Sequence, residues 1–140
     1  DEELHLLALH VQDAARLQAA LEAIRAMRVS RAAEMVAKLG ALGVEVTMDD
    51  VLRESAGGAV GRPHVARALV ARGAVKDVRL AFDVYLGAGK PAYVPKEQLA
   101  IADAIRLAHE AGGIAVAAHL GPDGTREYVE RLHGLGLDVL

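Results

Sequence analysis

The sequence predicts an α/β fold in which a small helical subdomain is inserted into a scaffold of strands and helices. Two short apolar runs of strand length, residues 4–9 and 114–118, favour buried strands. Between them, a block from about Arg28 to Pro95 consists of helix and loop patterns and is too long for one crossover. We therefore expect scaffold segments at 1–27 and 96–140, a helical insertion at 28–95, and parallel strand pairing.

The helices follow from apolar spacing and from capping residues. Apolar residues at helical spacing predict a long helix from about Ala14 to Leu42. Thr47 with Asp50 three residues later predicts a capping box and a short helix, and Pro63 suits the first turn of the next helix. Further helices are expected at about 76–86, 97–111 and 125–134, with a loop at 87–95, a turn at 121–124 and a last strand at 137–140.

Composition excludes several classes of protein. The chain has 140 residues, 53% hydrophobic and 25% charged, which indicates a globular domain rather than disorder. A net charge of −3 provides no general basic field for duplex DNA. The absence of cysteine leaves only His, Asp, Glu and water as metal ligands and favours the cytoplasm. No apolar run reaches the roughly 20 residues of a membrane span, and no signal-peptide pattern is present.

The two ends of the sequence also carry information. The chain enters an apolar run within a few residues of Asp1 and closes on the apolar segment 137–140. Natural domains more often begin and end in polar, frayed segments. We therefore expect that sequence is missing at both ends.

Two histidines are candidate metal ligands. His119 directly follows the apolar run 114–118, and active groups of βα folds gather at the carboxyl ends of strands. On position alone, a metal ligand and a hydrogen-bonding strand-end residue are equally good interpretations. His5 lies within the first apolar run, where a satisfied core histidine is the commoner case. His10, His109 and His133 are expected to be structural or surface residues.

Basic residues form two candidate phosphate-binding groups. Arg28 and Arg31 share a helix face, and guanidinium pairs at this spacing can hold a phosphate, although a solvated basic stripe is the simpler explanation. Arg62 and His64 lie in the first turn of a predicted helix, where free N–H groups attract anions. An ordinary capped helix start explains that pattern about as well. No Walker loop, dinucleotide fingerprint or Ser-His-Asp order is present.

Five segments, in order, resemble the PHP (polymerase and histidinol phosphatase) superfamily. They are residues 4–8 (LHLLA), 28–32 (RVSRA), 61–66 (GRPHVA), 90–95 (KPAYVP) and 112–119 (GGIAVAAH). The combination of Arg-x-x-Arg, Gly-Arg-Pro-His and Tyr-Val-Pro is similar to one branch of the superfamily. That branch contains 3′,5′-nucleoside bisphosphate phosphatases and 5′→3′ exoribonucleases of short RNA.

The resemblance implies a distorted, TIM-like βα barrel, part of which this chain would form. It also implies a cluster of divalent metal ions, usually Mn²⁺, with Fe²⁺, Zn²⁺ or Mg²⁺ as alternatives, beneath a small helical insertion. By resemblance, His5 and His119 match metal ligands. Arg28, Arg31, Arg62 and His64 match positions that hold substrate phosphate. Lys90 and Tyr93 lie in a loop near the site and receive no role, and no catalytic residue is assigned.

The departures from the family pattern define what the segment lacks. The family's opening His-x-His pair, its further Asp, His and Glu ligands, and its closing Asp-x-His pair are absent, and Leu120 replaces the usual Pro after His119. We expect a metal-dependent phosphoesterase of bisphosphonucleotides or short RNA 5′ ends, catalytically incomplete in this segment. A non-catalytic nucleotide or RNA-end binding module and a phosphatase of non-nucleotide phosphomonoesters remain alternatives. The oligomeric state stays open.

Overall fold

The computed structural model describes residues 4–120 and 124–140, and the chain divides into two compact units. Unit 1 comprises Asp1–Glu22 and Gln98–Leu140, and unit 2 comprises Ala23–Glu97. One boundary therefore falls inside the long first helix and the other shortly before the helix α5 (Ile101–Glu110). The assignment of these units to a barrel segment and an insertion stays a prediction. Within the described residues, no helix is both long and apolar enough to span a bilayer.

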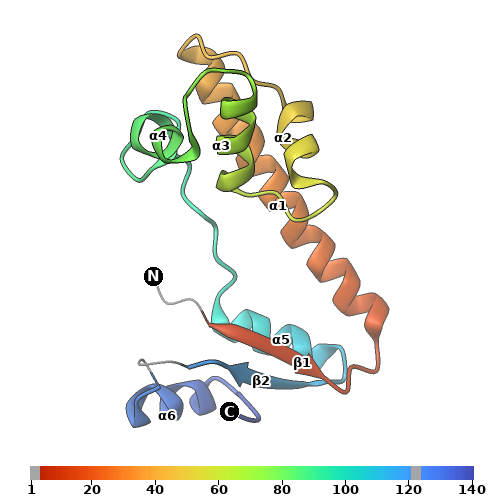
Figure 1. Ribbon diagram of the computed structural model, residues 1–140. Coiled ribbons are helices and arrows are strands. Elements are labelled where there is room, and N and C mark those ends of the chain that lie inside the picture. The colour runs from red at the N-terminus through yellow and green to blue at the C-terminus, as the bar shows by residue number, and fades with distance from the viewer. Residues whose placement is uncertain (1–3, 121–123) are drawn as a thin grey trace. The chain divides into compact units, whose positions relative to one another are not determined.

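Unit 1 is built on a two-stranded sheet with helices on one face (Figure 1). Strands β1 (His5–Leu9) and β2 (Ile114–Ala118) pair antiparallel, from His5 opposite Ala118 to Leu9 opposite Ile114. Helices α5 (Ile101–Glu110) and α6 (Arg126–Gly134) complete the unit. Its buried core is formed by Ile105, Ala108, Ala115, Ala117, Leu132 and Leu137.

The expected parallel pairing of the first two strands is wrong. Gln12 N and Asp13 N both donate to Ala111 O, at 3.0 and 2.9 Å, so the chain leaving β1 is tied to the end of α5. The Gly112–Gly113 turn then starts β2 beside the end of β1, which forces the strands to run in opposite directions. Among the described residues, parallel pairing is limited to an isolated bridge between Val116 and Val139, which α6 separates in the chain. The strand expected at 137–140 is reduced to this bridge.

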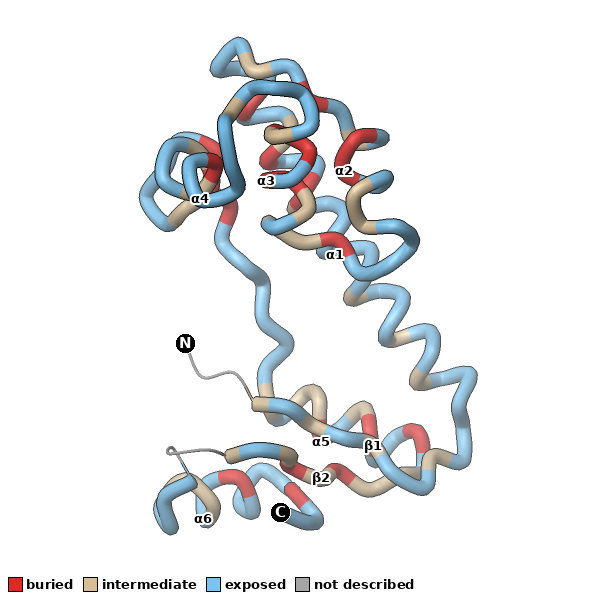
Figure 2. Tube along the Cα trace, viewed as in Figure 1, coloured by how far each residue is buried: buried red, intermediate tan, exposed pale blue. Residues whose placement is uncertain are grey.

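The first two strands are less buried than expected. Along β1 the residues alternate between half-buried and exposed, and along β2 between half-buried and buried (Figure 2). Leu6 and Ala8 pack on the core of unit 1, whereas Leu7 and Leu9 are 48% and 42% exposed. This alternation is what one covered sheet face produces. A fully buried strand would need cover on both faces, which the described residues of unit 1 do not supply.

Unit 2 is a helical body around the second half of α1 (Ala14–Ala41). Helices α2 (Met48–Ser55), α3 (Arg62–Ala71) and α4 (Val78–Ala81) pack with it, and a π-helix, η1 (Phe82–Leu86), follows α4 directly. The buried positions gather where these elements meet (Figure 2). The largest fully buried side chains of this core are Met35, Leu39, Val51, Val65, Leu69 and Leu86.

Most helices begin and end close to the expected residues. Helix α1 starts after Asp13, whose carboxylate accepts a hydrogen bond from Arg16 N. The helix predicted at 97–111 begins later than expected, at Ile101. Thr125 caps α6 as expected. The single helix expected at 76–86 is divided into α4 and η1. The turn expected at 121–124 lies mostly outside the described residues.

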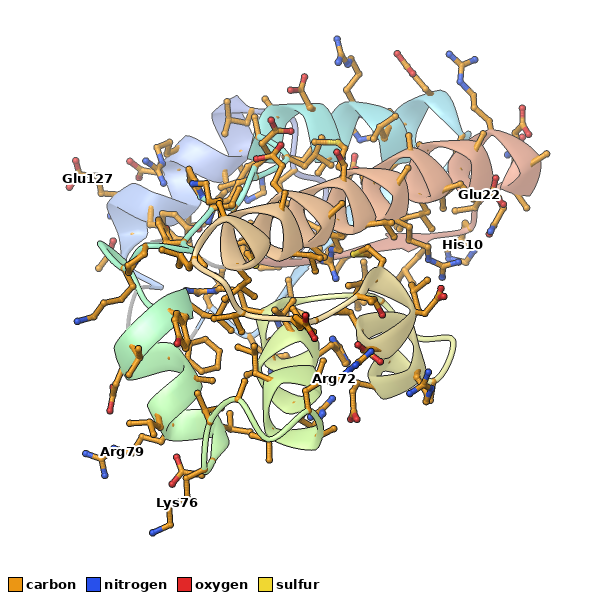
Figure 3. All side chains as sticks on the ribbon, turned by 90° about the horizontal axis from the view of Figure 1, so that it is seen from above. His10, Glu22, Arg72, Lys76, Arg79 and Glu127 are labelled. Atoms are coloured by element: carbon orange, nitrogen blue, oxygen red, sulfur yellow. The ribbon has the colours of Figure 1, made fainter. Side chains whose placement is uncertain are left out.

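Asp50 links the start of α2 to the end of α3. The predicted capping box is confirmed, because Thr47 Oγ1 accepts from Asp50 N and Asp50 Oδ2 accepts from Thr47 N. Arg72 Nε also donates to Asp50 Oδ2 at 2.8 Å, and Figure 3 shows Arg72 between α2 and α3. Hydrogen bonds from Arg72, then from the Thr47 backbone, lower the pKa of Asp50 to about 2. One carboxylate thus joins two helices.

The π-helix depends on a glycine. Gly87 N donates to Phe82 O at 2.8 Å, an i to i+5 bond that closes the wide turn. A Cβ added to Gly87 would lie 2.7 Å from this same carbonyl oxygen. Gly87 is therefore required for close approach rather than for a left-handed backbone, since its φ is −66°. Short π-helical turns are frequent at functional sites.

Replacing Asp50 should produce acid-dependent destabilisation. Because the folded-state pKa of about 2 lies below the unfolded value of 3.8, the stabilisation is complete above the unfolded value and disappears as the pH falls through the folded value. Asp50→Asn should lower the free energy of unfolding, measured by urea denaturation, at neutral pH. The gap to the wild type should shrink between about pH 4 and about pH 2. Asp49→Asn, at the exposed neighbouring position, is the control and should leave the profile nearly unchanged.

Gly87→Ala should destabilise unit 2 by about 1–3 kcal/mol, because the new Cβ collides with backbone rather than with a movable side chain. Gly40→Ala is the matched control. Gly40 lies within α1, where an added Cβ would meet no atom within 4 Å, so alanine should stabilise by about 0.5–1 kcal/mol. Thermal unfolding followed by circular dichroism measures both. Equal midpoints for the two variants would contradict the packing argument.

Candidate functional site

His5 and His119 lie side by side in unit 1. The ring centroids are 6.4 Å apart with an interplanar angle of 85°. The antiparallel register explains this proximity, since His5 pairs with Ala118 and His119 follows it in the chain. His5 is therefore at the amino end of β1, beside the carboxyl end of β2. The two histidines thus meet through antiparallel pairing, and not at the shared edge of parallel strands that the sequence suggested.

Both rings are accessible, and the backbone of His119 is unusual. His5 is on the exposed face of β1, and His119 is exposed with φ of +59°, in the left-handed region. Histidine enters this region more often than most non-glycine residues, but it is still uncommon there. The left-handed backbone ends the regular alternation of β2. The pair, named here the histidine pair, thus consists of two exposed imidazoles, and no described residue places a buried carboxylate between them.

The histidine pair fits part of a divalent metal site. Imidazole nitrogen is a good ligand for Mn²⁺, Fe²⁺ and Zn²⁺, and two adjacent exposed rings can bind without disturbing the core. Within residues 4–120 and 124–140, however, no group of three or more His, Asp or Glu side chains is arranged to hold a metal ion. A catalytic centre needs further ligands beyond these two.

Two of the other four histidines, His109 and His133, have polar contacts within unit 1. His109 Nε2 lies 2.7 Å from Asp138 Oδ2, which also accepts a hydrogen bond from Ala115 N. The contact with His109, followed by that with Ala115, lowers the pKa of Asp138. His133 Nδ1 is 3.0 Å from Leu137 O. His10 lies just beyond the other end of β1 from His5 (Figure 3).

In unit 2, Arg31 and Arg62 come together from α1 and from the start of α3. Burial, and next the positive charge of Arg62, lower the pKa of Arg31. Arg31 Nε donates to Val94 O at 2.9 Å, and Arg62 Nη1 donates to Leu86 O at 3.4 Å. Among the described residues, neither guanidinium has a carboxylate within ion-pair distance. We call these two residues the arginine pair.

Two aromatic rings hold the Arg62 side chain. Its Cζ lies 5.6 Å from the centroid of the Phe82 ring and 5.6 Å from that of the Tyr93 ring. Both distances are within the range of a cation–π interaction. Phe82 is in η1 and Tyr93 is in the loop that follows, so the π-helix and the loop converge on one guanidinium. The sequence motifs assign Tyr93 no role and do not include Phe82, although Phe82 is the only phenylalanine of the chain.

His64 and Arg28 differ in how the structure places them. His64 Nδ1 accepts a hydrogen bond from Gly61 N at 2.9 Å. A neutral His64 ring must therefore carry its proton on Nε2, which leaves that N–H as a donor. Arg28 is exposed on α1, one turn before Arg31, and its side chain makes no hydrogen bond or ion pair with any described residue. The structure thus unites Arg31 with Arg62 and leaves Arg28 apart.

Comparison with known proteins connects these features to one family. The chain is 40% identical over 132 residues to a 3′,5′-nucleoside bisphosphate phosphatase of Chromobacterium violaceum, covering 92% of this chain and 46% of that protein. It is 40% identical over 118 residues to a 5′-3′ exoribonuclease of Haemophilus influenzae, covering 84% of this chain and 43% of that one. No family model matches the chain.

Two solved structures also have folds similar to that of this chain. A protein named a metal-dependent phosphoesterase, from Bifidobacterium adolescentis, has a TM-score of 0.72 at 31% identity, over 100% of this chain and 52% of that one. An amidohydrolase from Chromobacterium violaceum, solved with bound sulfate and no metal, has a TM-score of 0.67 at 37% identity, over 97% and 50%. The shared part is a helix-rich α/β fold, in which the described residues of this chain form a small two-stranded sheet.

Binding of Mn²⁺ to the histidine pair can be tested by NMR. Because the paramagnetic ion broadens nearby protons, the ring signals of His5 and His119 should broaden at lower Mn²⁺ concentrations than those of His10, His109 and His133. His119→Ala should reduce the broadening at His5, since one of two ligands is lost. Uniform broadening of these five rings would show that the two residues form no preferred site.

The chain spans about half the length of the curated relatives that it matches, at 46% and 43%. The matched proteins are named as a nucleoside bisphosphate phosphatase, an exoribonuclease and a metal-dependent phosphoesterase. These relatives and this structural neighbour fit a phosphoesterase of the PHP family.

Proposed function

We propose that this chain is a segment of a metal-dependent phosphoesterase that acts on 3′,5′-bisphosphonucleotides or on the 5′ ends of short RNA. The arginine pair carries the proposal. Two guanidiniums lie close enough to repel each other, and the described residues offer them carbonyl oxygens and aromatic rings but no carboxylate. A phosphate between them would neutralise this charge, and guanidinium groups bind phosphate oxygens in bidentate fashion.

Each basic residue has a role in this proposal. Arg31 and Arg62 would bind one phosphate group directly. The Nε2–H group of His64 would donate a hydrogen bond to the same anion, because its Nδ1 is already occupied by Gly61 N. Arg28, free of other partners among the described residues, would reach a second phosphate or the continuing backbone of RNA. Holding one phosphate in this way would decide which ester bond is presented for hydrolysis.

The metal would be held in part by the histidine pair. Mn²⁺ is the ion that we expect, with Fe²⁺, Zn²⁺ and Mg²⁺ as alternatives. When bound, such an ion activates water and offsets the negative charge that develops on the phosphate. The remaining ligands would come from outside the described residues, which hold no group of three.

A second candidate function is a binding module without hydrolysis. The observation that favours it is the imbalance between the two sites. The arginine pair is held in place by hydrogen bonds to backbone carbonyls, whereas the histidine pair lacks further ligands among residues 4–120 and 124–140. In this case a nucleotide or an RNA 5′ end would bind to the arginine pair, and no ester bond would be broken.

Phosphate release distinguishes these functions. The substrates are 3′-phosphoadenosine 5′-phosphate, a 5′-phosphorylated RNA oligonucleotide and p-nitrophenyl phosphate, each with added Mn²⁺. The 140-residue chain is compared with a chimera that adds the flanking segments of the Chromobacterium violaceum phosphatase. We expect the chimera to hydrolyse a nucleotide substrate in preference to p-nitrophenyl phosphate. Arg62→Met in the chimera should lower kcat/KM by about 100-fold.

The chain alone should bind the nucleotide and release little phosphate. Arg79→Met, on the exposed side of α4 (Figure 3), controls for the loss of one positive charge. A chimera that bound the nucleotides but hydrolysed none would favour the binding module. Faster hydrolysis of p-nitrophenyl phosphate than of either nucleotide would mean that the substrate assignment is wrong.

A further inference from the structure

The loop after the π-helix is tied to α1 through its backbone. Lys38 Nζ donates to Tyr93 O at 2.9 Å, and Arg31 Nε donates to Val94 O at 2.9 Å. The two donors are seven residues apart on α1, about two helical turns, so they lie on one helix face. Two successive carbonyls of the loop are therefore fixed by two cations of the same helix. We call this pair of hydrogen bonds the carbonyl clamp.

The clamp decides where the Tyr93 ring lies. The backbone of Tyr93 is held at its own carbonyl and at the next one, and Tyr93 N donates to Lys90 O at 3.0 Å. With the backbone fixed, the half-buried ring has few orientations, and it lies beside Arg62. Lys38 is exposed and has no carboxylate partner among the described residues, so its ammonium group is held by the bond to Tyr93 O.

The opposite side of Arg62 is fixed by the π-helix. Phe82 supplies the second ring and Leu86 supplies the carbonyl that accepts from Arg62 Nη1, and these residues begin and end η1. An arginine side chain has many rotamers, and holding one of them costs entropy when a ligand must do it. Two rings and one carbonyl hold this rotamer before any ligand binds.

We propose that Tyr93 is a positioning residue that sets the Arg62 guanidinium for phosphate binding, and that Lys38 acts through it by holding its backbone. This inference rests on the proposed function of the arginine pair and deepens it. Only the aromatic ring of Tyr93 is needed, because the cation–π contact uses the ring face. The specificity of the site for phosphate thus depends on a tyrosine that need not touch the ligand.

Calorimetric titration of the 140-residue chain with 3′-phosphoadenosine 5′-phosphate, without metal, tests the proposal. Tyr93→Leu should weaken binding about tenfold, because the ring is lost and Arg62 regains its freedom. Tyr93→Phe keeps the ring and should restore affinity to within about twofold of the wild type. Circular dichroism melts of both variants establish that they are folded. Equal losses in both variants would overturn the proposal, because the hydroxyl rather than the ring would then be responsible.

If Tyr93→Leu does not fold, a second pair of variants still tests the role of Lys38. Lys38→Met removes one half of the carbonyl clamp, and Lys76→Met removes the same charge from an exposed site that extends away from unit 2 (Figure 3). Lys38→Met should weaken binding several-fold more than Lys76→Met. Equal effects would reduce Lys38 to a general electrostatic contribution and overturn its role.

Binding by the wild type distinguishes a failure of the Tyr93 positioning role from a failure of the proposed function. If the wild type binds the bisphosphonucleotide and Tyr93→Leu binds it equally well, the positioning role is wrong and the proposed function stands. If the wild type binds neither the bisphosphonucleotide nor inorganic phosphate, while Arg62→Met leaves the titration unchanged, the arginine pair is not a phosphate site. The proposed function then fails, and the positioning role fails with it.

Discussion

The arrangement of unit 2 depends on how two like charges are held near each other. Arg31 donates one hydrogen bond to Val94 O and Arg62 donates one to Leu86 O, and two aromatic rings lie beside Arg62. A carbonyl oxygen satisfies a guanidinium N–H without cancelling its charge. A carboxylate would have made a stronger local contact but would have removed the positive potential. The core of unit 2 must therefore supply the stability that the arginine pair does not.

Arg72, unlike Arg31 and Arg62, is paired with a carboxylate, that of Asp50. The Asp50 carboxylate caps α2 and forms an ion pair with Arg72 at the end of α3. The positive charge of Arg72 is therefore neutralised in a contact that stabilises the fold. The two kinds of arginine are told apart by their partners and not by residue type. The Asp50–Arg72 ion pair thus ties α2 to the end of α3, whereas Arg31 and Arg62 have no carboxylate partner among the described residues.

Much of the helical part could be predicted because its signals are local. Asp13, Thr47, Pro63 and Thr125 act within one turn of their own helices, and each marks a helix start that the structure contains. The strand direction could not be predicted in this way. It is set by the bonds of Gln12 and Asp13 to Ala111, which join residues about a hundred positions apart. Periodicity within a strand carries no information about such contacts.

The residues of the candidate site could likewise be identified from the sequence only in part. His5, His119, Arg31, Arg62 and His64 stand out because their residue types and motifs carry chemistry. Phe82, Lys38 and the role of Tyr93 do not, since they act through ring faces and backbone carbonyls that appear only when η1 and the loop fold together. The π-helix itself has no sequence pattern comparable to a capping box. Its wide turn arises because Gly87 N bonds to Phe82 O.

The left-handed backbone of His119 costs conformational stability, whereas its imidazole is the group proposed to bind a metal. An L-residue in this region costs on the order of 1 kcal/mol relative to glycine, and histidine reduces that cost only in part. Random substitution followed by selection for thermostability would therefore tend to replace His119 with glycine or asparagine. A library sorted only for folding would drift away from the residue that we propose as a metal ligand. The position offers a direct way to separate selection for stability from selection for activity in this family.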